Sequence, residues 1–571
     1  MRSIRATFEG IALAATATAL TLFVPPLGCT PSFGPPIPTA HPGDVEPRRG
    51  GTLRLASFQD IGGLDPAGPT DGLAFQAERL IFAGLVDYDE TGALVPDLAA
   101  RWDVEDEGRA YRFVMRRGVI MQDGEELTAD DVRRAAERAL HPSAPNPSAS
   151  YMENISGYDD YLARRADHLR GIVVESRYVV SFRLAQPDAT FLSLLAMPML
   201  RPVCKSAGDR YLDSWTPCGA GPFKLAPGGW QRGMSLRLQR HRDYFRAGLP
   251  YLDEIEWSFN LPLFAQRLRF QRGDLDVLRD MTRADQARFL ADERWRALGS
   301  NEPDTNIYGE SMNTRMAPFD NVEVRRAVAT AVDREHYKAL KPAAITVVTQ
   351  PLPPGVPGYD ETAVGQHYDY AAALDHMRKA GYAYDPLTGA GGWPRPIVYP
   401  VYDQGLLVST AQLLQQDLSK IGLRLELKVV SWSTFLALQH RPGAVAISQA
   451  SWEMDYPDAS SFFDPLFTTA SINPEASFNT AFYSNPPFDA LVARAHREID
   501  PTVRRGLYRD ATAILVDDAP WAFAYSYHFF VLRQAYVRGL AKRAIGAFDP
   551  TRAWVDRPQG EWRRRPLGYA P

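Results

Sequence analysis

The chain has 571 residues, of which 45% are hydrophobic and 23% are charged, and its formal net charge is −5. At roughly 100–200 residues per domain, this length predicts about three or four structural units and not a single core. The composition is that of a soluble globular protein, which excludes a wholly disordered chain, a collagen-like rod and a polytopic membrane protein. The negative charge argues against general nucleic-acid binding.

The N-terminus carries a short basic region and then an apolar run of 14 residues at 11–24. Because a membrane-spanning helix needs about 20 residues, this run predicts a signal peptide over residues 1–28. The small residue directly before Cys29 resembles a bacterial lipoprotein cleavage site, although Pro26 stands where a leucine-type residue is usual. The resemblance implies lipid on Cys29, and a plain secretory signal is the alternative.

The segment that follows, residues 29–49, is rich in proline and predicts an extended tether. Of the three cysteines, Cys204 and Cys218 remain if Cys29 carries lipid. In an oxidising compartment we expect them to form a disulfide, and a loop of about 15 residues would add roughly 3 kcal/mol. Two buried free thiols are the alternative.

Strand and helix patterns alternate along the rest of the chain. Strands are predicted at 52–56, 85–88, 94–96, 102–104, 111–116, 221–225, 235–239, 254–258 and 423–430, and helices at 74–85, 129–140, 409–420, from about 320 and from 501. Thr128 and Asp320 begin capping-box patterns, and Asp500 precedes a proline in the first turn of its helix. This order predicts an α/β protein with mixed sheets.

Catalytic and metal-binding motifs do not emerge from the sequence. HExxH, GxSxG, GxxxxGK[ST] and a serine site of the SxxK type are all missing, and the histidines lack ligand-like spacing. The glycines at 219 and 221 are followed by a proline and a strand pattern, which does not fit a dinucleotide-binding loop. We therefore expect no enzyme activity, no cofactor and no metal.

Several segments in a fixed order together resemble the extracytoplasmic solute-binding proteins of the peptide/nickel class, family 5, which serve ABC importers. The longest is LVPDLAARWDVEDEGRAYRFVMRRGVIMQDGEELTADDVRRAAERAL at 94–140; others lie at 218–223, 273–276, 312–313, 318–319, 324–327, 380–382, 421–422, 452–457 and 518–520. The resemblance covers about residues 50–545. It implies an α/β, two-lobed periplasmic-binding-protein-like fold of the class II or cluster C type, with three domains and a hinge around a central cleft.

The resemblance also implies domain limits. Domain I is expected to combine three pieces, domain II to be inserted and domain III to be continuous: 50–85, 201–302 and 529–571 with the C-terminal tail for domain I, 86–200 for domain II, and 303–528 for domain III.

The segment Trp452-Glu453-Met454-Asp455-Tyr456 resembles the one whose aspartate pairs with the peptide α-ammonium in peptide-binding relatives. A cation in a cleft that excludes water needs a fixed counter-charge, and Asp455 is the candidate. A strand from Gln449 to Glu453 could bond the peptide backbone, and Trp452, Met454 or Tyr456 could supply apolar contact. Alternatively, Asp455 caps a turn and the aromatic residues belong to the core.

Three further positions are candidates because of where they fall in the family pattern. Asp65 follows the first strand, where it either holds its loop or contacts ligand; Tyr308 and Asn313 lie on a segment that resembles a strand lining the cleft. The partner of the ligand carboxylate stays open between Arg315, Lys341 and His440.

The sequence thus predicts a monomeric, membrane-anchored periplasmic lipoprotein that captures small peptides and delivers them to the permease subunits of an ABC transporter. The alternatives are a non-peptide solute on the same fold, such as a nickel chelate, haem, an oligosaccharide or an opine, and a sensor or chaperone without transport. A hydrolase is the least favoured reading.

Overall fold

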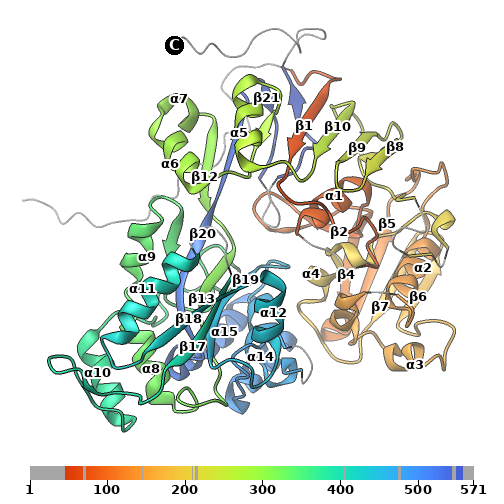
Figure 1. Cartoon of the computed structure of the whole chain (residues 1–571). Coiled ribbons are helices and arrows are strands. Elements are labelled where there is room, and N and C mark those ends of the chain that lie inside the picture. The colour runs from red at the N-terminus through yellow and green to blue at the C-terminus, as the bar shows by residue number, and fades with distance from the viewer. Residues whose placement is uncertain are drawn as a thin grey trace, which may run out of the picture. The chain divides into compact units, whose positions relative to one another are not determined.

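The computed structural model describes residues 46–556 except 69–71, 145, 209, 212–215, 403–406, 474–476 and 543–547 (Figure 1). The predicted signal peptide, Cys29 and most of the predicted tether lie outside the described residues. Within the described part of the chain, no helix combines the length and the apolar character that crossing a membrane requires.

The first sheet joins strands that are far apart in the sequence. Its order is β1-β10-β9-β8, and it contains β1 (Thr52–Ala56), β8 (Phe223–Gln231), β9 (Ser235–Arg240) and β10 (Glu254–Ser258). Strands β1 and β10 run parallel while the other neighbours are antiparallel, so the sheet is mixed, as the sequence predicted. Leu53 and Leu55 of β1 are buried with Ile255 of β10, against helix α1 (Gly72–Ile81).

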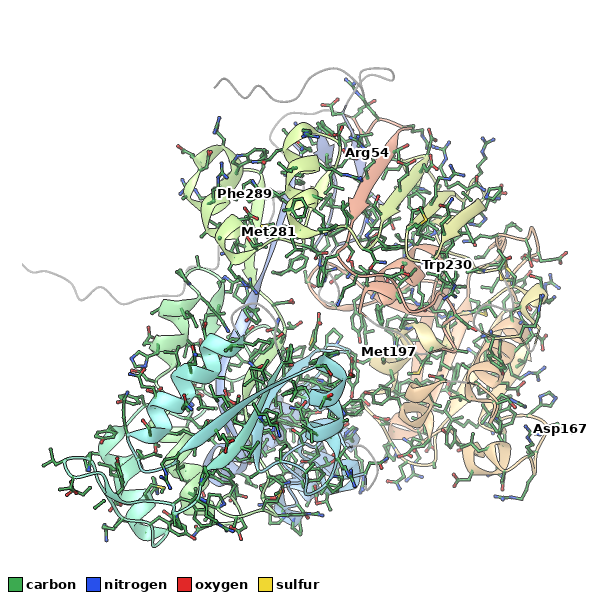
Figure 2. The ribbon with its side chains drawn as sticks, viewed as in Figure 1. Arg54, Asp167, Met197, Trp230, Met281 and Phe289 are labelled. Atoms are coloured by element: carbon green, nitrogen blue, oxygen red, sulfur yellow. A yellow bond between two sulfur atoms is a disulfide. The ribbon has the colours of Figure 1, made fainter. Side chains whose placement is uncertain are left out.

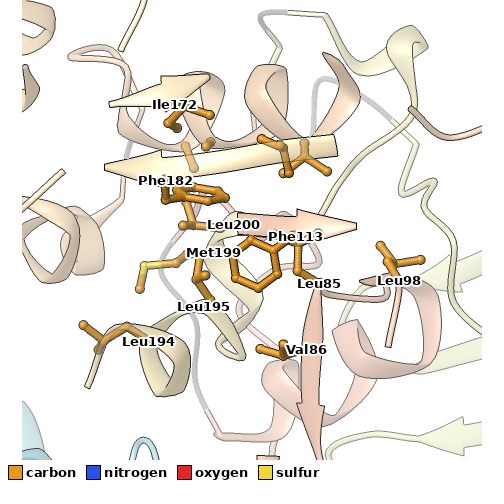
Figure 3. Close-up of a cluster of buried hydrophobic side chains, with 14 of the residues drawn as sticks. Leu85, Val86, Leu98, Phe113, Ile172, Phe182, Leu194, Leu195, Met199 and Leu200 are labelled. Carbon is orange, nitrogen blue, oxygen red and sulfur yellow. The ribbon is translucent and has the colours of Figure 1, made fainter. Parts of the chain in front are cut away.

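A second sheet, with the order β4-β5-β7-β6, is antiparallel throughout: β4 (Ala99–Glu105), β5 (Ala110–Met115), β6 (Ile172–Ser176) and β7 (Val179–Arg183). Phe113 of β5 and Phe182 of β7 meet edge to face at 5.8 Å in its core, where Leu195 and Leu200 also lie (Figure 3). Helix α2 (Ala129–Leu140) contacts β6 and β7.

The third sheet has the order β11-β20-β13-β19, with β12 and β14 also paired to β20. Its strands are β11 (Val277–Leu278), β12 (Gly299–Pro303), β13 (Asn306–Met312), β14 (Ile345–Val347), β19 (Ile447–Glu453) and the 13-residue β20 (Trp521–Arg533). The start of β20 pairs with β13 and its end pairs with β11 and β12, so one strand is common to several cores. The first and third sheets are further linked by Arg54 of β1, labelled in Figure 2, whose Nη2 lies 2.7 Å from Oδ1 of Asp276.

The remaining elements surround these sheets. The strands are β2 (Val86–Tyr88), β3 (Leu94–Pro96), β15 (Tyr384–Asp385), β16 (Ala390–Gly391), β17 (Ile397–Tyr402), β18 (Leu425–Val430), β21 (Val537–Arg538) and β22 (Trp554–Val555). The helices are α3 (Tyr158–Leu162), α4 (Phe191–Leu195), α5 (Leu263–Arg272), α6 (Arg283–Ala291), α7 (Glu293–Arg296), α8 (Val322–Ala331), α9 (Arg334–Leu340), α10 (Tyr370–Lys379), α11 (Leu407–Ser419), α12 (Trp432–His440), α13 (Ser460–Phe467), α14 (Pro486–Arg497) and α15 (Pro501–Asp518).

Several predicted limits differ from the structure: the helix predicted at 74–85 is α1 and ends at Ile81, and the strand predicted at 423–430 is β18 and begins at Leu425. Two further differences have a clear local cause. Helix α8 is capped by Asn321, whose Oδ1 accepts a hydrogen bond from the Glu323 N–H at 2.9 Å, and not by Asp320, whose own N–H is used in the preceding turn. Strand β8 begins two residues later than predicted because Gly221 lies against the end of α1. Its N–H donates to the Ile81 carbonyl, and an added Cβ there would come within 2.4 Å of the Ile81 carbonyl carbon.

The structure joins Cys204 and Cys218 in a disulfide, the pairing favoured by the sequence over free thiols. Cys204 is fully buried in the core of the second sheet, and Cys218 packs at its margin. Asp123 lies close to the two sulfur atoms. Because both sulfurs are in the disulfide, they do not offer thiolate ligands to a metal.

Candidate functional site

A hollow of about 270 Å³ lies at one end of the paired strands β13 and β19; its lining residues are Asn306, Tyr308, Ser451, Trp452, Glu453 and Asp455. In the register of the two strands, Asn306 is opposite Glu453 and Tyr308 is opposite Ser451. Side chains alternate between the faces of a sheet, so these four residues share one face. The hollow therefore lies over one face of the sheet, at the end of this strand pair, and polar side chains line it.

Strand β19 forms the end of its sheet among the described strands. The Met454 N–H donates to the Thr305 carbonyl across the strand pair at 3.0 Å. Because the bonding direction alternates along an antiparallel strand, the N–H and C=O groups of Ser451 and Glu453 point away from β13. The carbonyl of Gln449, two residues before Ser451, points the same way and already accepts a hydrogen bond from the Gln439 side-chain amide at 2.5 Å. The part of β19 beside the hollow can thus accept another extended chain.

Asp455 lies just beyond β19, and its carboxylate makes one side-chain hydrogen bond among the described residues. The Tyr151 hydroxyl donates to its Oδ2 at 3.3 Å, which is long for such a bond. Burial raises the pKa of Asp455 to about 6, and the Tyr151 hydrogen bond opposes that shift. Among the described residues, no arginine, lysine or histidine forms an ion pair with it.

Glu453 is the second carboxylate of the hollow. The residue is exposed to solvent, and desolvation by the surrounding protein atoms raises the pKa of its carboxyl group to about 7. The negative charges of Asp304 and Asp455 add to the increase in pKa, whereas the positive charge of Arg279 opposes it. The described residues provide no hydrogen-bond or ion-pair partner for this carboxylate. Two carboxylates of the hollow thus lack a bound cation.

Two nearby aspartates, in contrast, each have a basic side chain as a partner. Asp458 forms an ion pair with Arg504 at 2.6 Å and accepts a hydrogen bond from the Tyr508 hydroxyl at 2.8 Å. Asp464 lies 3.0 Å from Nε2 of His496. The absence of a cation at Asp455 is therefore not general to this segment.

Of the apolar candidate residues in the same segment, one borders the hollow and two lie in hydrophobic cores. Trp452 lines the hollow, donates its Nε1–H to the Ser461 carbonyl at 2.7 Å and packs edge to face on Phe478. Met454 and Tyr456 are 4% and 2% exposed and belong to hydrophobic cores. Strand alternation directs the Trp452 ring to the face of β19 opposite to Ser451 and Glu453, where it packs against a hydrophobic core. Trp452 is thus at the hollow as a residue of β19, whereas Met454 and Tyr456 are not.

Tyr308 forms one wall of the hollow and stacks on Tyr525 at 5.2 Å. Behind it, the Gln449 amide and the Lys341 ammonium both donate to the Tyr525 hydroxyl, at 3.4 Å and 2.8 Å. Burial lowers the pKa of Lys341 to about 7, and the charge of Arg283 acts in the same direction. Gln449 and Lys341 therefore support the wall and are not among the residues lining the hollow.

The other sequence candidates lie elsewhere. Asp65 is 3% exposed and bonds Arg138 through both carboxylate oxygens at 2.8 Å, so it fixes its loop. Asn313 is buried, with its Nδ2 donating to the Val445 carbonyl at 3.3 Å. Arg315 is exposed, and His440 packs on Phe478. None of these side chains lines the hollow.

A larger cavity of about 680 Å³ lies between α1, the β2–β3 hairpin, the 244–249 loop, Ala541 and the 549–552 segment. Its charged walls are already compensated in part, because Arg79 pairs with Asp87, and Arg246 lies 2.7 Å from Asp97. Such internal pairing favours a structural role. The smaller hollow, with its two free carboxylates, is the better candidate for a ligand.

Sequence reasoning missed Asn306, Ser451, Glu453 and Tyr151 at this site. The alternation of β19 could have indicated Glu453 and Ser451, since both share the parity of Asp455. Tyr151 carries no comparable signal, because it is 304 positions from the carboxylate it contacts.

Comparisons with known proteins agree on one family. A family model described as "Bacterial extracellular solute-binding proteins, family 5 Middle" matches residues 93–474. The probable deoxycholate-binding periplasmic protein YgiS of Escherichia coli K12 is 28% identical over 508 residues, covering 85% of this chain and 90% of that protein. Di/tripeptide-binding protein 2 of Pseudomonas aeruginosa is also 28% identical, over 88% of this chain and 95% of the relative.

Solved structures extend the comparison to the fold. The clavulanic acid biosynthesis oligopeptide binding protein 2 superposes with a TM-score of 0.80 at 25% identity, covering 89% of this chain and 96% of that one. The predicted fold class, α/β with the two-lobed architecture of periplasmic binding proteins, is thereby confirmed.

Proposed function

Because the chain belongs to the family 5 bacterial extracellular solute-binding proteins, which serve ABC importers, we propose that it captures small peptides in the hollow beside β19 and delivers them to membrane permease subunits. The peptide α-ammonium binds the Asp455 carboxylate, and the peptide backbone pairs with the outer edge of β19. The chain itself performs no catalysis in this proposal.

One observation carries the proposal: Asp455 is a largely buried carboxylate with a single hydroxyl partner among the described residues. A buried charge is costly unless it is paired, and Asp458 and Asp464 on the same segment both have their cations. A ligand ammonium would supply the missing charge. The raised pKa of Asp455 is the expected property of such a group before its ligand arrives.

The edge of β19 supports a peptide over other amines. Ser451 and Glu453 direct backbone donors and acceptors outward beside the hollow, and a peptide in extended form can satisfy them. Backbone pairing is indifferent to side-chain identity, so affinity can be shared among many sequences. The ring of Tyr308 adds apolar surface at the same place.

Non-peptide solutes on the same fold, including nickel chelates, haem, oligosaccharides and opines, are less well matched. The E. coli relative is described as binding deoxycholate, which is an anion. Two carboxylates without a bound cation would repel an anion in a hollow of low dielectric. A sensor or chaperone role would use the same hollow without the permease.

The cellular setting completes the proposal. Residues 1–28 serve as signal peptide, Cys29 carries lipid, and residues 29–49 tether a monomeric periplasmic body to the membrane. The body is divided into the three domains stated above, with the ligand held in the cleft between the lobes.

The test is titration calorimetry with Ala-Ala-Ala and its N-acetyl derivative. Wild-type protein should bind the free amine and not the acetylated peptide, and Asp455→Ala should lose about 2–5 kcal/mol of binding free energy. Glu335→Gln is the matched control, because it removes an exposed carboxylate of α9. Equal affinity of wild type and Asp455→Ala for the free amine would refute the proposed role of Asp455.

A further inference from the structure

The Glu453 carboxylate is a feature of the hollow that an ammonium on Asp455 does not explain. It belongs to the last residue of β19, two residues before Asp455, and both residues line the hollow. Asp455 has the Tyr151 hydroxyl as a partner, whereas the described residues provide none for Glu453. An ammonium held by Asp455 therefore leaves Glu453 available to a second group of the ligand.

We propose that Glu453 forms a second anionic subsite, which selects peptides with a basic side chain at their first or second position. This inference rests on the proposed function and defines its substrate class. The carboxylate would bind a guanidinium through two parallel hydrogen bonds, or an ammonium through one.

The charges around Glu453 favour a cation. Asp304 and Asp455 are both near enough to influence it, and Arg279 is the one cation with a resolved effect. The Arg279 guanidinium lies over the Phe529 ring at 5.3 Å and forms no ion pair with Glu453. Arg283 and Lys341 lie behind the tyrosine wall, over the rings of Tyr527 and Tyr525, and neither forms an ion pair with Glu453. At the hollow itself the carboxylates of Glu453 and Asp455 would stabilise a second ligand cation.

A polar neighbour opposite Glu453 is also available to a ligand. Asn306 is 8% exposed, and its Oδ1 accepts a hydrogen bond from the Tyr527 N–H at 2.8 Å. Among the described residues, no group accepts a hydrogen bond from its amide nitrogen, and the side chain lines the hollow. A ligand carbonyl beside the basic side chain could accept a hydrogen bond from this nitrogen.

The pKa of Glu453, raised to about 7 by desolvation, agrees with this geometry. Near neutral pH part of the population holds a proton on this carboxylate. A guanidinium would displace that proton, so binding of a basic peptide should release more protons than binding of a neutral one. Calorimetry in buffers of different ionisation enthalpy measures this difference.

The decisive experiment compares arginine with citrulline, which has a similar shape and no charge. Arg-Ala-Ala, Ala-Arg-Ala and Ala-Ala-Arg are titrated against their citrulline counterparts and Ala-Ala-Ala, with wild type, Glu453→Gln, Glu453→Ala, Asp455→Ala and Glu335→Gln. Thermal melts establish that each variant is folded. Wild type should prefer arginine about tenfold at position one or two, as a charge-assisted bidentate pair requires.

The two Glu453 variants should lose that preference, so that their affinities for the arginine peptides fall to those for the citrulline peptides. Glu335→Gln, which removes an exposed carboxylate of α9, should keep the wild-type preference and the wild-type affinity for Ala-Ala-Ala. Equal affinity for arginine and citrulline at both positions, or a preference that survives in Glu453→Gln, overturns the subsite while the proposed function stands. Failure of every free-amine peptide to bind overturns both.

Discussion

Two kinds of carboxylate lie close together in the segment 453–464: those of Asp458 and Asp464, which have a cationic partner, and those of Glu453 and Asp455. Asp458 and Asp464 are held by Arg504 and His496 at 2.6 Å and 3.0 Å. Glu453 and Asp455 have no such partner among the described residues. Paired carboxylates in this segment therefore fix its structure, whereas those without a cation are available to a ligand.

The His496 cluster shows how completely the structural carboxylates are satisfied. The His496 ring also lies 3.7 Å from Asp188, and the Ala189 N–H donates to the His496 carbonyl at 2.7 Å. Burial alone would lower the pKa of His496, but the charges of Asp464 and Asp188 outweigh it and raise this pKa to about 10. The cluster ties the loop after β7 to helix α14.

The largest effect on folding is expected for Arg504→Gln. This change leaves Asp458 buried without its cation, and breaking a buried pair should cost about 3 kcal/mol of unfolding free energy. Chemical denaturation measures the loss. Asp455→Asn is the matched control and should cost almost nothing, because it removes a carboxylate that has no cation. A similar loss in both variants would abolish the distinction between the two kinds of carboxylate.

His496→Gln should have a smaller effect, about 1–3 kcal/mol of stability at pH 6, because solvent partly screens its two ion pairs. A raised histidine pKa contributes stability that is fully present below the unfolded value of about 6.5 and is lost as pH rises through about 10. The deficit of the variant should accordingly shrink between pH 7 and pH 10. A deficit that does not change over this range would contradict the charge assignment.

The smallest effect is the pH dependence of Ala-Ala-Ala binding. The ammonium requires ionised Asp455, whose pKa is about 6, so affinity should rise roughly tenfold from pH 5 to pH 7. It should fall above about pH 8, where the peptide amine loses its proton. The other ionisable groups near this region include Tyr151, Glu453, Asp304 and Arg279, and behind the tyrosine wall Arg283 and Lys341. In calorimetry, the affinity of Asp455→Ala should not rise between pH 5 and pH 7. A rise that persists in this variant would show that another group causes it.

Local chemistry explains what could be predicted of the fold. Thr128 begins α2 with its N–H donating to Asp131 at 2.9 Å, and Asp500 caps α15 by accepting from the Thr502 N–H at 2.8 Å. In each case the capping residue and its hydrogen-bond partner lie within four residues of each other in the sequence. Strand β20 escaped prediction because it is buried along most of its length and shows no alternation of apolar and polar residues.

The site was predictable only where one motif carried it. The motif placed Asp455 and Trp452 at the hollow, but it also named Met454 and Tyr456, which the structure buries in cores. Asp65 was also a candidate, but its carboxylate is bound by Arg138, which is 73 positions away in the sequence. Pairing between distant residues decides whether an acidic side chain is free, and no local pattern records it.

Strand β20 has a consequence for biosynthesis. It pairs with β11 and β12, whose residues precede it by more than 200 positions, as the register of Gly299 with Leu532 shows (Figure 1). The third sheet, and with it the wall formed by Tyr308 and Tyr525, cannot be completed until residues 521–533 are available. Until then β13 has an open edge, where unfinished chains can associate wrongly. The late position of this one strand in the sequence therefore prolongs the time during which β13 is unpaired as the chain folds.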